Sequence, residues 1–350
     1  MRPSSPINQY PTPEEMDNWL DKMFESIEND PLLNFDDSDD KETSNTDIDD
    51  IPDARSKEKV SAFDKLMALE GLEEVKEAVQ REISYHRIMQ IRRKAKCRVP
   101  KRLTHLLLVG NPGTGKTTVA KLIGKIYHEA GILENDTFIE TNRAALVGEY
   151  IGHSEARTKE LIEKARGGIL FIDEIYSLAE AVNNGCSNDF GRQVIDTLMP
   201  LLSDPDSGVM VIGAGYPDEM KKFLKLNSGL ASRFPVVLRF NDFSIGQLMN
   251  IASKELARYD FRFSEEAEIK FRNLIKEASA LNNSGNARLV VSMISNYLIP
   301  RLCMRIDSPD VSLLDIDSIS VIEVSDVPDF NEIHSLLEEK KCRRNLGFCR

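Results

Sequence analysis

Apolar positions recur along this chain in two different patterns, and each pattern predicts a kind of element. Short apolar runs bounded by polar or turn residues are typical of buried strands, whereas apolar positions spaced three and four apart are typical of helices. Beyond residue 57 the two patterns alternate, which favours a mostly parallel sheet with helices on both faces. The runs that predict strands are 104–110, 137–140, 168–172 and 209–214, and the first helical segments are 63–91 and 116–131.

The alternation stops after Phe240, and no strand is expected beyond it. Segments with helical spacing follow instead, so we predict an α/β fold with a core at 57–240 and a small all-α domain at 241–305. The tail 306–350 is a C-terminal extension to which the sequence assigns no structure. The helical segments of the small domain are 245–260, 264–280 and 286–302.

The N-terminal segment 1–56 is predicted to be largely disordered. Residues 28–56 combine acidic runs with Ser, Thr, Asn and Pro, and they bury too little apolar surface to offset chain entropy. One short helix is expected at 12–27, after a capping-box start at Thr12. It could dock on a partner or on its own chain, or be only marginally folded. Its apolar face consists of Met16, Trp19, Leu20, Met23, Phe24 and Ile27.

The charge of the chain is concentrated at its N-terminus. Residues 1–55 hold 16 acidic and 4 basic side chains, which accounts for the whole net charge of -12, while the remainder is balanced at 41 against 41. An acidic balance argues against a nucleic-acid partner, because phosphate binding needs clustered positive charge. The one basic stretch, 92–102, is interpreted as a solvated helix end and loop.

Cysteine usage and hydropathy favour a soluble, cytoplasmic protein without a membrane partner. The five cysteines are scattered and show no CxxC spacing, so neither a disulfide framework nor a zinc site is expected. No stretch approaches the roughly 18 continuous apolar residues of a membrane span, and the N-terminus lacks the apolar segment of a signal peptide.

The stretch Gly110–Thr117, GNPGTGKT, matches the phosphate-loop pattern GxxxxGK[ST] between an expected strand and an expected helix. The backbone N–H groups of such a turn bind phosphate oxygens, the lysine brings positive charge to the β and γ phosphates, and the hydroxyl that follows ligates Mg²⁺. We therefore expect ATP and Mg²⁺ as cofactors. The residues expected to hold them here are Asn111, Pro112, Gly113, Thr114, Gly115, Lys116, Thr117 and Thr118.

The run GGILFIDE, residues 167–174, predicts a buried central strand that delivers two carboxylates at its C-terminal end. Ligands bind at that end of a parallel sheet. Asp173 is then placed to hold Mg²⁺, usually through water, and Glu174 to deprotonate the water that attacks the γ-phosphate. An apolar strand that ends in Asp-Glu is a weak signal alone, but it is a strong one in the same chain as Lys116.

Two arginines and one loop carry further candidate chemistry. Arg233, in NSGLASRF, could reach the γ-phosphate of a neighbouring subunit, and Arg288, in GNAR, begins a helix that could fold over the nucleotide. In LVGEYIG, Tyr150 and Ile151 stand next to glycines, which is unusual unless the loop grips something. A surface arginine and a loop packed on its own domain remain the alternatives.

Taken together, these strings resemble AAA+ ATPases, and within that class the CbxX/CfqX group, over residues 62–305. The resemblance implies an arginine finger at Arg233, a sensor-2 arginine at Arg288 and a pore-loop aromatic at Tyr150. It leaves the sensor-1 role unassigned, because Tyr216 stands where many AAA+ proteins carry Asn. The matching strings include GNPGTGKTTVA, LVGEYIGHSEARTKELIEKARGGILFIDEIYSL, IGAGYPDEM, NSGLASRF and GNAR.

The same resemblance places Gly71 and Leu72 beside the nucleotide and implies a homo-oligomeric ring, with a hexamer expected. We predict an ATPase that pulls on a protein substrate through Tyr150 and Ile151. A nucleotide-dependent scaffold stays open as an alternative, although an intact Glu174 disfavours it. A loader that acts on DNA or RNA would want a basic face or a helix-turn-helix, and neither is visible. Members of the group act in Rubisco remodelling, sporulation and secretion, and no residue here selects one substrate.

Overall fold

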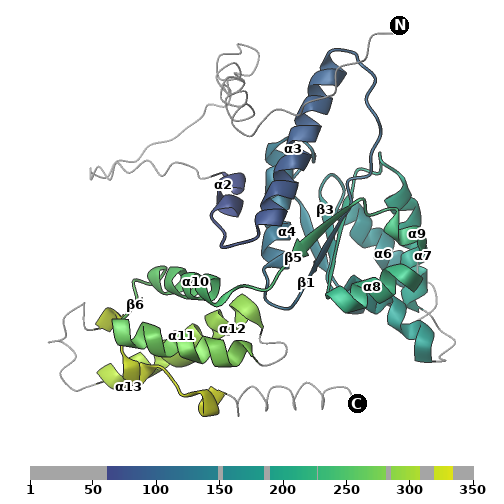
Figure 1. The fold of residues 1–350 in the computed structure, drawn as a ribbon. Helices are drawn as coiled ribbons and strands as arrows, with labels where there is room; N and C mark the ends of the chain where they lie inside the picture. Colours follow the sequence, from purple (N-terminus) through teal and green to yellow (C-terminus); the bar gives the residue numbers. More distant parts are fainter. Residues whose placement is uncertain are drawn as a thin grey trace, which may run out of the picture. The chain divides into compact units, whose positions relative to one another are not determined.

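The computed structural model describes residues 61–148, 153–184, 190–226, 228–280, 285–307 and 319–333. The chain divides into two units, Met1–Glu58 and Lys59–Arg350, and the described residues belong to the second (Figure 1). The helix predicted at 12–27 lies outside the described residues, as do Tyr150 and Ile151.

A five-stranded parallel sheet forms the centre of the first part of this unit. The strand order is β2-β3-β4-β1-β5, so β1, which precedes the phosphate loop, lies inside the sheet beside β4. The predicted α/β fold with a parallel sheet is confirmed. The strands are β1 (Leu106–Gly110), β2 (Phe138–Thr141), β3 (Ile169–Ile172), β4 (Met210–Gly215) and β5 (Val236–Phe240).

Successive residues of the inner strands enter different hydrophobic cores, because side chains alternate across a sheet. Leu107 belongs to the core under α6 to α9, whereas Leu106 and Leu108 belong to the core under α2 to α4. Figure 1 shows these two groups of helices on opposite sides of the sheet. The helices are α2 (Ala62–Met67), α3 (Glu73–Lys94), α4 (Lys116–Glu129), α5 (Arg143–Leu146), α6 (His153–Lys164), the 3₁₀ helix η1 (Ile175–Asn184), α7 (Phe190–Ser203), α8 (Pro217–Leu226) and α9 (Ser228–Ala231).

One long helix was expected at 63–91, and this expectation is wrong in one respect, because the helix is interrupted at Gly71 and Leu72. Both residues have left-handed φ angles, 62° and 65°. Such a conformation ends a right-handed helix, and Leu72 becomes the N-cap residue of α3. The apolar spacing continues across the break, which is why the periodicity alone did not indicate it.

The second part of the unit is a helical lid. Its helices are α10 (Ile245–Ala257), α11 (Glu265–Ser279), α12 (Asn286–Met293), the π-helical turn η2 (Ile294–Leu298), α13 (Ile299–Ile306) and the 3₁₀ turn η4 (Val324–Asp326). The expectation of no strand after Phe240 is wrong, since β6 (Arg262–Phe263) and β7 (Val321–Ile322) pair in parallel. Two-residue strands are too short to show an alternating pattern.

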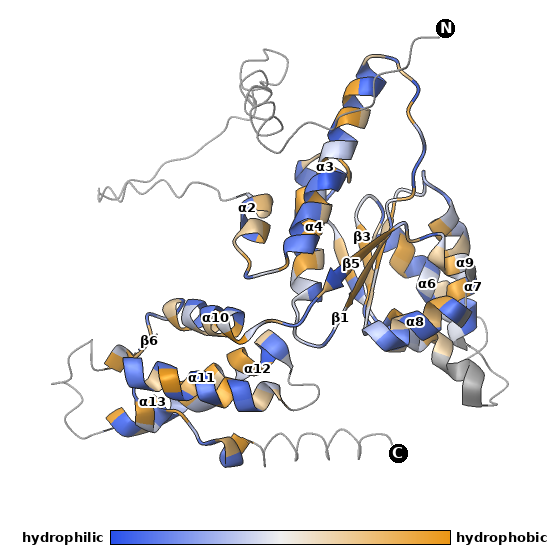
Figure 2. Cartoon of the chain, in the orientation of Figure 1, coloured by the Kyte–Doolittle hydropathy of each residue, from blue (hydrophilic) through white to orange (hydrophobic). Residues whose placement is uncertain are grey.

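The lid has a hydrophobic core of its own. Phe271, Ile275 and Leu298 are fully buried in it, and the described part of the expected C-terminal extension contributes Ile322 and Ile333. Among the described residues, one helix, Asn286–Ile306, is long and apolar enough to cross a membrane by length and composition. One apolar face of that helix packs into the lid core, and Figure 2 shows polar residues between its apolar ones.

Candidate functional site

The phosphate loop connects the end of β1 to the start of α4. Gly113 and Gly115 adopt left-handed φ angles of 74° and 92°, and Gly115 is the N-cap residue of α4 without a side-chain cap. The first N–H groups of a helix have no partner within the helix, and together with the helix dipole they attract an anion. The loop therefore presents backbone donors at the carboxyl edge of the sheet.

Lys116 is the buried cation of this loop, with a relative exposure of 9%. Its Nζ donates to Gly110 O at 2.8 Å and to Asn111 O at 2.9 Å. Burial lowers the pKa of Lys116, and the nearby Asp173 carboxylate opposes that effect. The two carbonyls hold the ammonium at the loop, where it can reach a phosphate with little loss of side-chain entropy.

Asp173 and Glu174 follow β3 at the same edge of the sheet. The Asp173 N–H donates to Thr141 O at 2.9 Å, which fixes the end of β3 against the end of β2. Glu174 has a left-handed φ of 49°, and its N–H donates to Asp173 Oδ1 at 3.0 Å. Left-handed backbone in a non-glycine residue carries strain that is common at functional sites. In this backbone conformation the exposed side chain of Glu174 lines the cleft together with Lys116 and Thr117.

Tyr216 follows β4 and contacts both halves of this site. Its hydroxyl donates to Glu174 Oε1 at 3.3 Å, and Lys116 Nζ lies 5.3 Å from the centroid of its ring. Burial raises the pKa of Tyr216, and the negative charge of Glu174 adds to the effect. The sequence pointed to this position without giving it a role. Because β4 lies between β1 and β3, a residue that follows β4 lies between Lys116 and Glu174.

The lid supplies the opposite wall of the cleft, which has a volume of about 560 Å³. Arg288, on the first turn of α12, faces Lys116 and Tyr216 closely enough to influence the pKa of both. Among the described residues, its guanidinium has no ion-pair partner. The expected site residues that line this cleft are Pro112, Gly113, Gly115, Lys116, Thr117, Thr118, Asp173, Glu174 and Arg288.

Other expected site residues do not line the cleft. Thr114 is fully buried and its Oγ1 donates to Asn111 O at 2.8 Å, so its side chain shapes the loop from behind. Asn111 donates to Asp242. Gly71 and Leu72 lie at the junction of core and lid. A Cβ on Gly71 would stand 2.7 Å from the side-chain Nε2 of Gln247.

Arg233 lies away from the cleft of its own chain. It precedes β5, at the amino edge of the parallel sheet, whereas Lys116 and Glu174 lie at the carboxyl edge. Its guanidinium is partly buried and donates to Gly229 O at 3.0 Å and to Ser203 Oγ at 3.2 Å. These contacts fix the side chain near the surface, where the nucleotide of the same chain is out of reach.

Some residues at or near the cleft were not predicted from the sequence. Asp242 and Asn286 join the phosphate loop to the lid. Asp242 belongs to no motif named above, and Asn286 lies in the string GNAR, of which only Arg288 was given a role. Ser292, Ser295 and Asn296 line the cleft from the α12 helix and the π-helical turn that follows it. A π-turn changes which side chains face a site and is frequent at functional sites, but no sequence pattern marks it.

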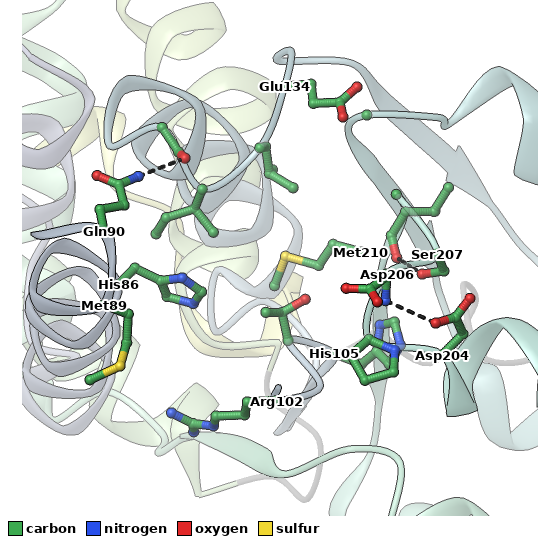
Figure 3. Close-up of a pocket in the computed structure, with 18 of the residues that line it drawn as sticks. His86, Met89, Gln90, Arg102, His105, Glu134, Asp204, Asp206, Ser207 and Met210 are labelled. Carbon is green, nitrogen blue, oxygen red and sulfur yellow. Dashed lines mark hydrogen bonds between the residues drawn. The ribbon is translucent and has the colours of Figure 1, made fainter. Parts of the chain in front are cut away.

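A second cleft, of about 260 Å³, lies at the opposite edge of the sheet, where β1, β3 and β4 begin. Several of its polar groups bond to neighbours in the cleft wall (Figure 3). Gln90 Nε2 donates to Gly131 O at 2.9 Å, and the Asp206 N–H donates to the Asp204 carboxylate at 3.0 Å. Burial lowers the pKa of His105 to about 4, so its ring is neutral at pH 7. We infer that the residues that line this cleft pack the fold and do not form a binding site.

A phosphate loop, a strand that ends in two carboxylates and an arginine from a helical lid surround one cleft, and together they define a phosphate-loop nucleotide-binding protein with a lid. Residues 106–242 match the model of the ATPase family associated with various cellular activities (AAA), and residues 244–338 match the AAA lid domain. The chain belongs to the AAA ATPase family, and the expected resemblance is confirmed.

The relatives include members of the group expected from the sequence. Stage V sporulation protein K of Bacillus subtilis (strain 168) is 42% identical over 237 residues, 67% of this chain and 72% of that protein. Protein CfxQ of Xanthobacter flavus is 34% identical over 258 residues, 73% of this chain and 80% of that protein. The crystal structure of the FIGL-1 AAA domain in complex with ADP aligns with a TM-score of 0.50 and 21% identity, over 78% of this chain and 89% of that chain. That likeness concerns the fold.

Proposed function

We propose that this chain is a Mg²⁺-dependent, ring-forming ATPase that couples hydrolysis to pulling on a protein partner. The observation that supports it most is the position of Glu174, whose carboxylate lines the same cleft as Lys116 and Thr117. A scaffold that only binds nucleotide needs no general base at that place. The AAA domain and its lid, which span residues 106–338, support the ATPase part of the proposal.

The oxygen ligands present fit Mg²⁺. The Thr117 hydroxyl and the Asp173 carboxylate line the cleft, and Mg²⁺ in phosphate-loop proteins needs few protein ligands because water and phosphate oxygens complete its shell. Bound there, the ion would neutralise charge on the β and γ phosphates.

The chain's own residues would carry hydrolysis as follows. The loop N–H groups and Lys116 bind the phosphates, and Arg288 adds positive charge from the lid. Glu174 accepts a proton from the water that attacks the γ-phosphate. This attack forms the new bond to phosphorus and breaks the bond between the γ-phosphorus and the bridging oxygen, so that ADP and phosphate are released. Tyr216 holds the Glu174 carboxylate through its hydroxyl.

Two further observations support the proposal. The position of Arg233 supports the ring, and the segment around Tyr150 supports the pulling role. Since Arg233 lies at the far edge of its own sheet, we propose that it completes the site of a neighbouring subunit. The segment with Tyr150 lies between two anchored ends: the Gly148 N–H donates to the buried Ser154 Oγ at 2.9 Å, and Arg157 donates to Val147 O at 3.0 Å. These hydrogen bonds fix the residues on either side of the proposed pulling residues.

Hydrolysis is tested by comparing Lys116→Ala with Glu174→Gln. The first variant should bind ATP weakly, because the loop loses its charge. The second should bind ATP like the unaltered chain yet turn over more slowly, by a factor on the order of 10² to 10⁴, as expected for the loss of a general base. Equilibrium binding and steady-state phosphate release measure the two effects. Normal turnover in Glu174→Gln would falsify the assignment.

A further inference from the structure

Asp242 lies between β5 and α10, at the junction of core and lid, and it binds both sides. From the core, Asn111 Nδ2 donates to the two carboxylate oxygens of Asp242 at 3.0 and 2.9 Å. From the lid, Asn286 Nδ2 donates to Asp242 Oδ1 at 2.9 Å. Hydrogen bonds to an ionised carboxylate are among the stronger ones in proteins. One side chain therefore joins a phosphate-loop residue to the start of α12.

Asn286 is the lid side of this junction, and its side chain is fully engaged. It is 6% exposed, its Nδ2 also approaches Pro112 O at 3.3 Å, and its Oδ1 accepts from the Phe243 N–H at 3.1 Å. Its φ is left-handed, at 47°, a conformation that Asn tolerates better than most residues. The Asn286 side chain thus donates two hydrogen bonds and accepts one. Together with its left-handed backbone, these bonds fix the direction in which α12 starts.

The phosphate loop and α12 also touch through their backbones. A Cβ placed on Gly113 would stand 2.0 Å from Gly285 O and 3.0 Å from the Cβ of Arg288. No side chain separates the two segments at this point. A shift of the loop when phosphate binds must therefore be followed by α12, or it must lengthen hydrogen bonds whose strength falls steeply with distance and angle.

We propose that Asp242, Asn111 and Asn286 form a core–lid latch that positions Arg288 over the phosphate loop and passes the occupancy of the loop to the lid. The latch rests on the proposed function, because Arg288 matters only where a nucleotide binds. Asn286 is two residues before Arg288 on the same helical turn, so a change in its contacts moves that side chain directly. Asp242 is also close enough to Lys116 to raise its pKa, although burial dominates there, so the latch lies within the electric field of the site.

The structure offers a matched contact for comparison. Glu70 of the core accepts from Asn250 at 2.8 Å and from Lys254 at 2.9 Å, both on α10. This second contact also joins core and lid, but it involves neither the phosphate loop nor α12. Lys254→Ala therefore removes a core–lid contact without affecting the latch.

The first test is a double-mutant comparison of ATP turnover. Asn286→Gly removes the lid-side hydrogen bonds of the latch and keeps the left-handed backbone, which glycine adopts freely. We expect it to lower kcat by about tenfold, the effect of losing one hydrogen bond to a charged group. In an Arg288→Ala background it should have no further effect beyond about twofold, because residues that act as one unit are not additive. Lys254→Ala should stay within about twofold of the unaltered chain and should multiply with Arg288→Ala.

The second test uses hydrogen exchange with ADP and does not depend on hydrolysis. In the unaltered chain, ADP should slow exchange in the phosphate loop and in residues 286–298. In Asn286→Gly it should slow exchange in the loop alone, and in Lys254→Ala in both. Melting curves check that each variant is folded, and if Asn286→Gly does not fold, Asn111→Ala, which removes only the core side of the latch, decides by the same two measurements.

Two results would overturn the proposal. One is that the losses of kcat from Asn286→Gly and Arg288→Ala multiply in the double variant. The other is that ADP still slows exchange in residues 286–298 of Asn286→Gly. Failure of the proposed function looks different: the unaltered chain would bind ADP without hydrolysing ATP, and the exchange experiment would still test the latch. Normal hydrolysis with a lid response independent of Asn286 would retain the ATPase and reject the latch.

Discussion

At the nucleotide cleft, single side chains connect groups that the sequence places far apart. Tyr216 is the clearest case, since it contacts Glu174 through its hydroxyl and Lys116 through its ring. Phenylalanine at this position would retain the ring contact and lose only the hydrogen bond, so the two contacts can be tested separately.

We predict that Tyr216→Phe lowers kcat for ATP by about tenfold, because Glu174 loses the hydrogen bond that orients its carboxylate. The KM for ATP should change by less than about twofold, since the groups that bind phosphate are untouched. Tyr216→Ala should in addition raise KM, because the ring next to Lys116 is lost. Steady-state kinetics measures both constants, and an unchanged kcat in Tyr216→Phe would show that the hydroxyl does not position Glu174.

His105 affects stability and not chemistry. The Val211 N–H donates to its Nδ1 at 3.0 Å, and burial lowers its pKa to about 4. The unfolded chain, with a His pKa of about 6.5, binds more protons than the folded chain between these values, so stability is lost as the pH falls from about 6.5 to 4. The loss attributable to this group amounts to at most about 3 kcal/mol.

His105→Asn keeps an acceptor near Val211 and removes the titrating ring. We predict that its free energy of unfolding depends less on pH than that of the unaltered chain between pH 6.5 and 4. Urea unfolding at several pH values measures this difference, in which the contributions of the carboxylates cancel. Identical pH profiles for the two chains would show that His105 retains an ordinary pKa in the folded protein.

At the scale of elements, strong periodic signals predicted the parts that lie inside the fold. The fully apolar run of β3 and the helical spacing of α4 appear in the sequence because burial demands them. The edge strand β5 was not predicted, because its apolar run, Val236 to Leu238, is short, and Val237 is 46% exposed. The break at Leu72 and the π-turn after Met293 depend on backbone conformations and tertiary contacts, which residue types do not encode locally.

The candidate site divides along the same line. Lys116, Asp173 and Glu174 were predicted because chemistry restricts the residue types and the strand ends fix their positions. Asp242 and Asn286 were not predicted, since an Asp before a helix and an Asn after a glycine are also ordinary capping residues. Only the approach of the lid to the phosphate loop gives them a further role.

The contact between the phosphate loop and α12 yields an element-scale prediction. Gly113→Ala introduces a Cβ that would stand 2.0 Å from Gly285 O, a backbone atom that cannot rotate away. Loop and lid must then separate, and we expect the affinity for ADP to fall by at least about tenfold, because the loop donors are displaced. Calorimetric titration with ADP measures the change.

Gly208→Ala is the matched control for the strain of alanine at a left-handed φ. Gly208 has a φ of 70°, similar to the 74° of Gly113, but nothing lies within 4 Å of its added Cβ. It should cost about 1 kcal/mol of stability and leave the affinity for ADP unchanged. Equal losses of affinity in both variants would mean that general destabilisation, and not the contact with the lid, explains the result.

At the scale of the whole molecule, the position of Arg233 supports the proposed assembly of subunits. A nucleotide site at one edge of the sheet and an arginine at the other suit a head-to-tail interface, in which each subunit completes the site of the next. Rotation that closes such an interface produces a ring, and the proposed pulling residues Tyr150 and Ile151 need one to surround a substrate.

The most direct measurement of the central claim is therefore ATP hydrolysis by mixed subunits. Arg233→Ala and Lys116→Ala should each be inactive alone, because the first lacks the residue given to its neighbour and the second lacks its own phosphate-binding cation. Mixed in equal amounts, they should recover about a quarter of the normal rate, since one boundary in four joins an intact loop to an intact arginine. A mixture as inactive as its two components, or Arg233→Ala with full activity alone, would contradict a ring in which Arg233 acts on the neighbouring site.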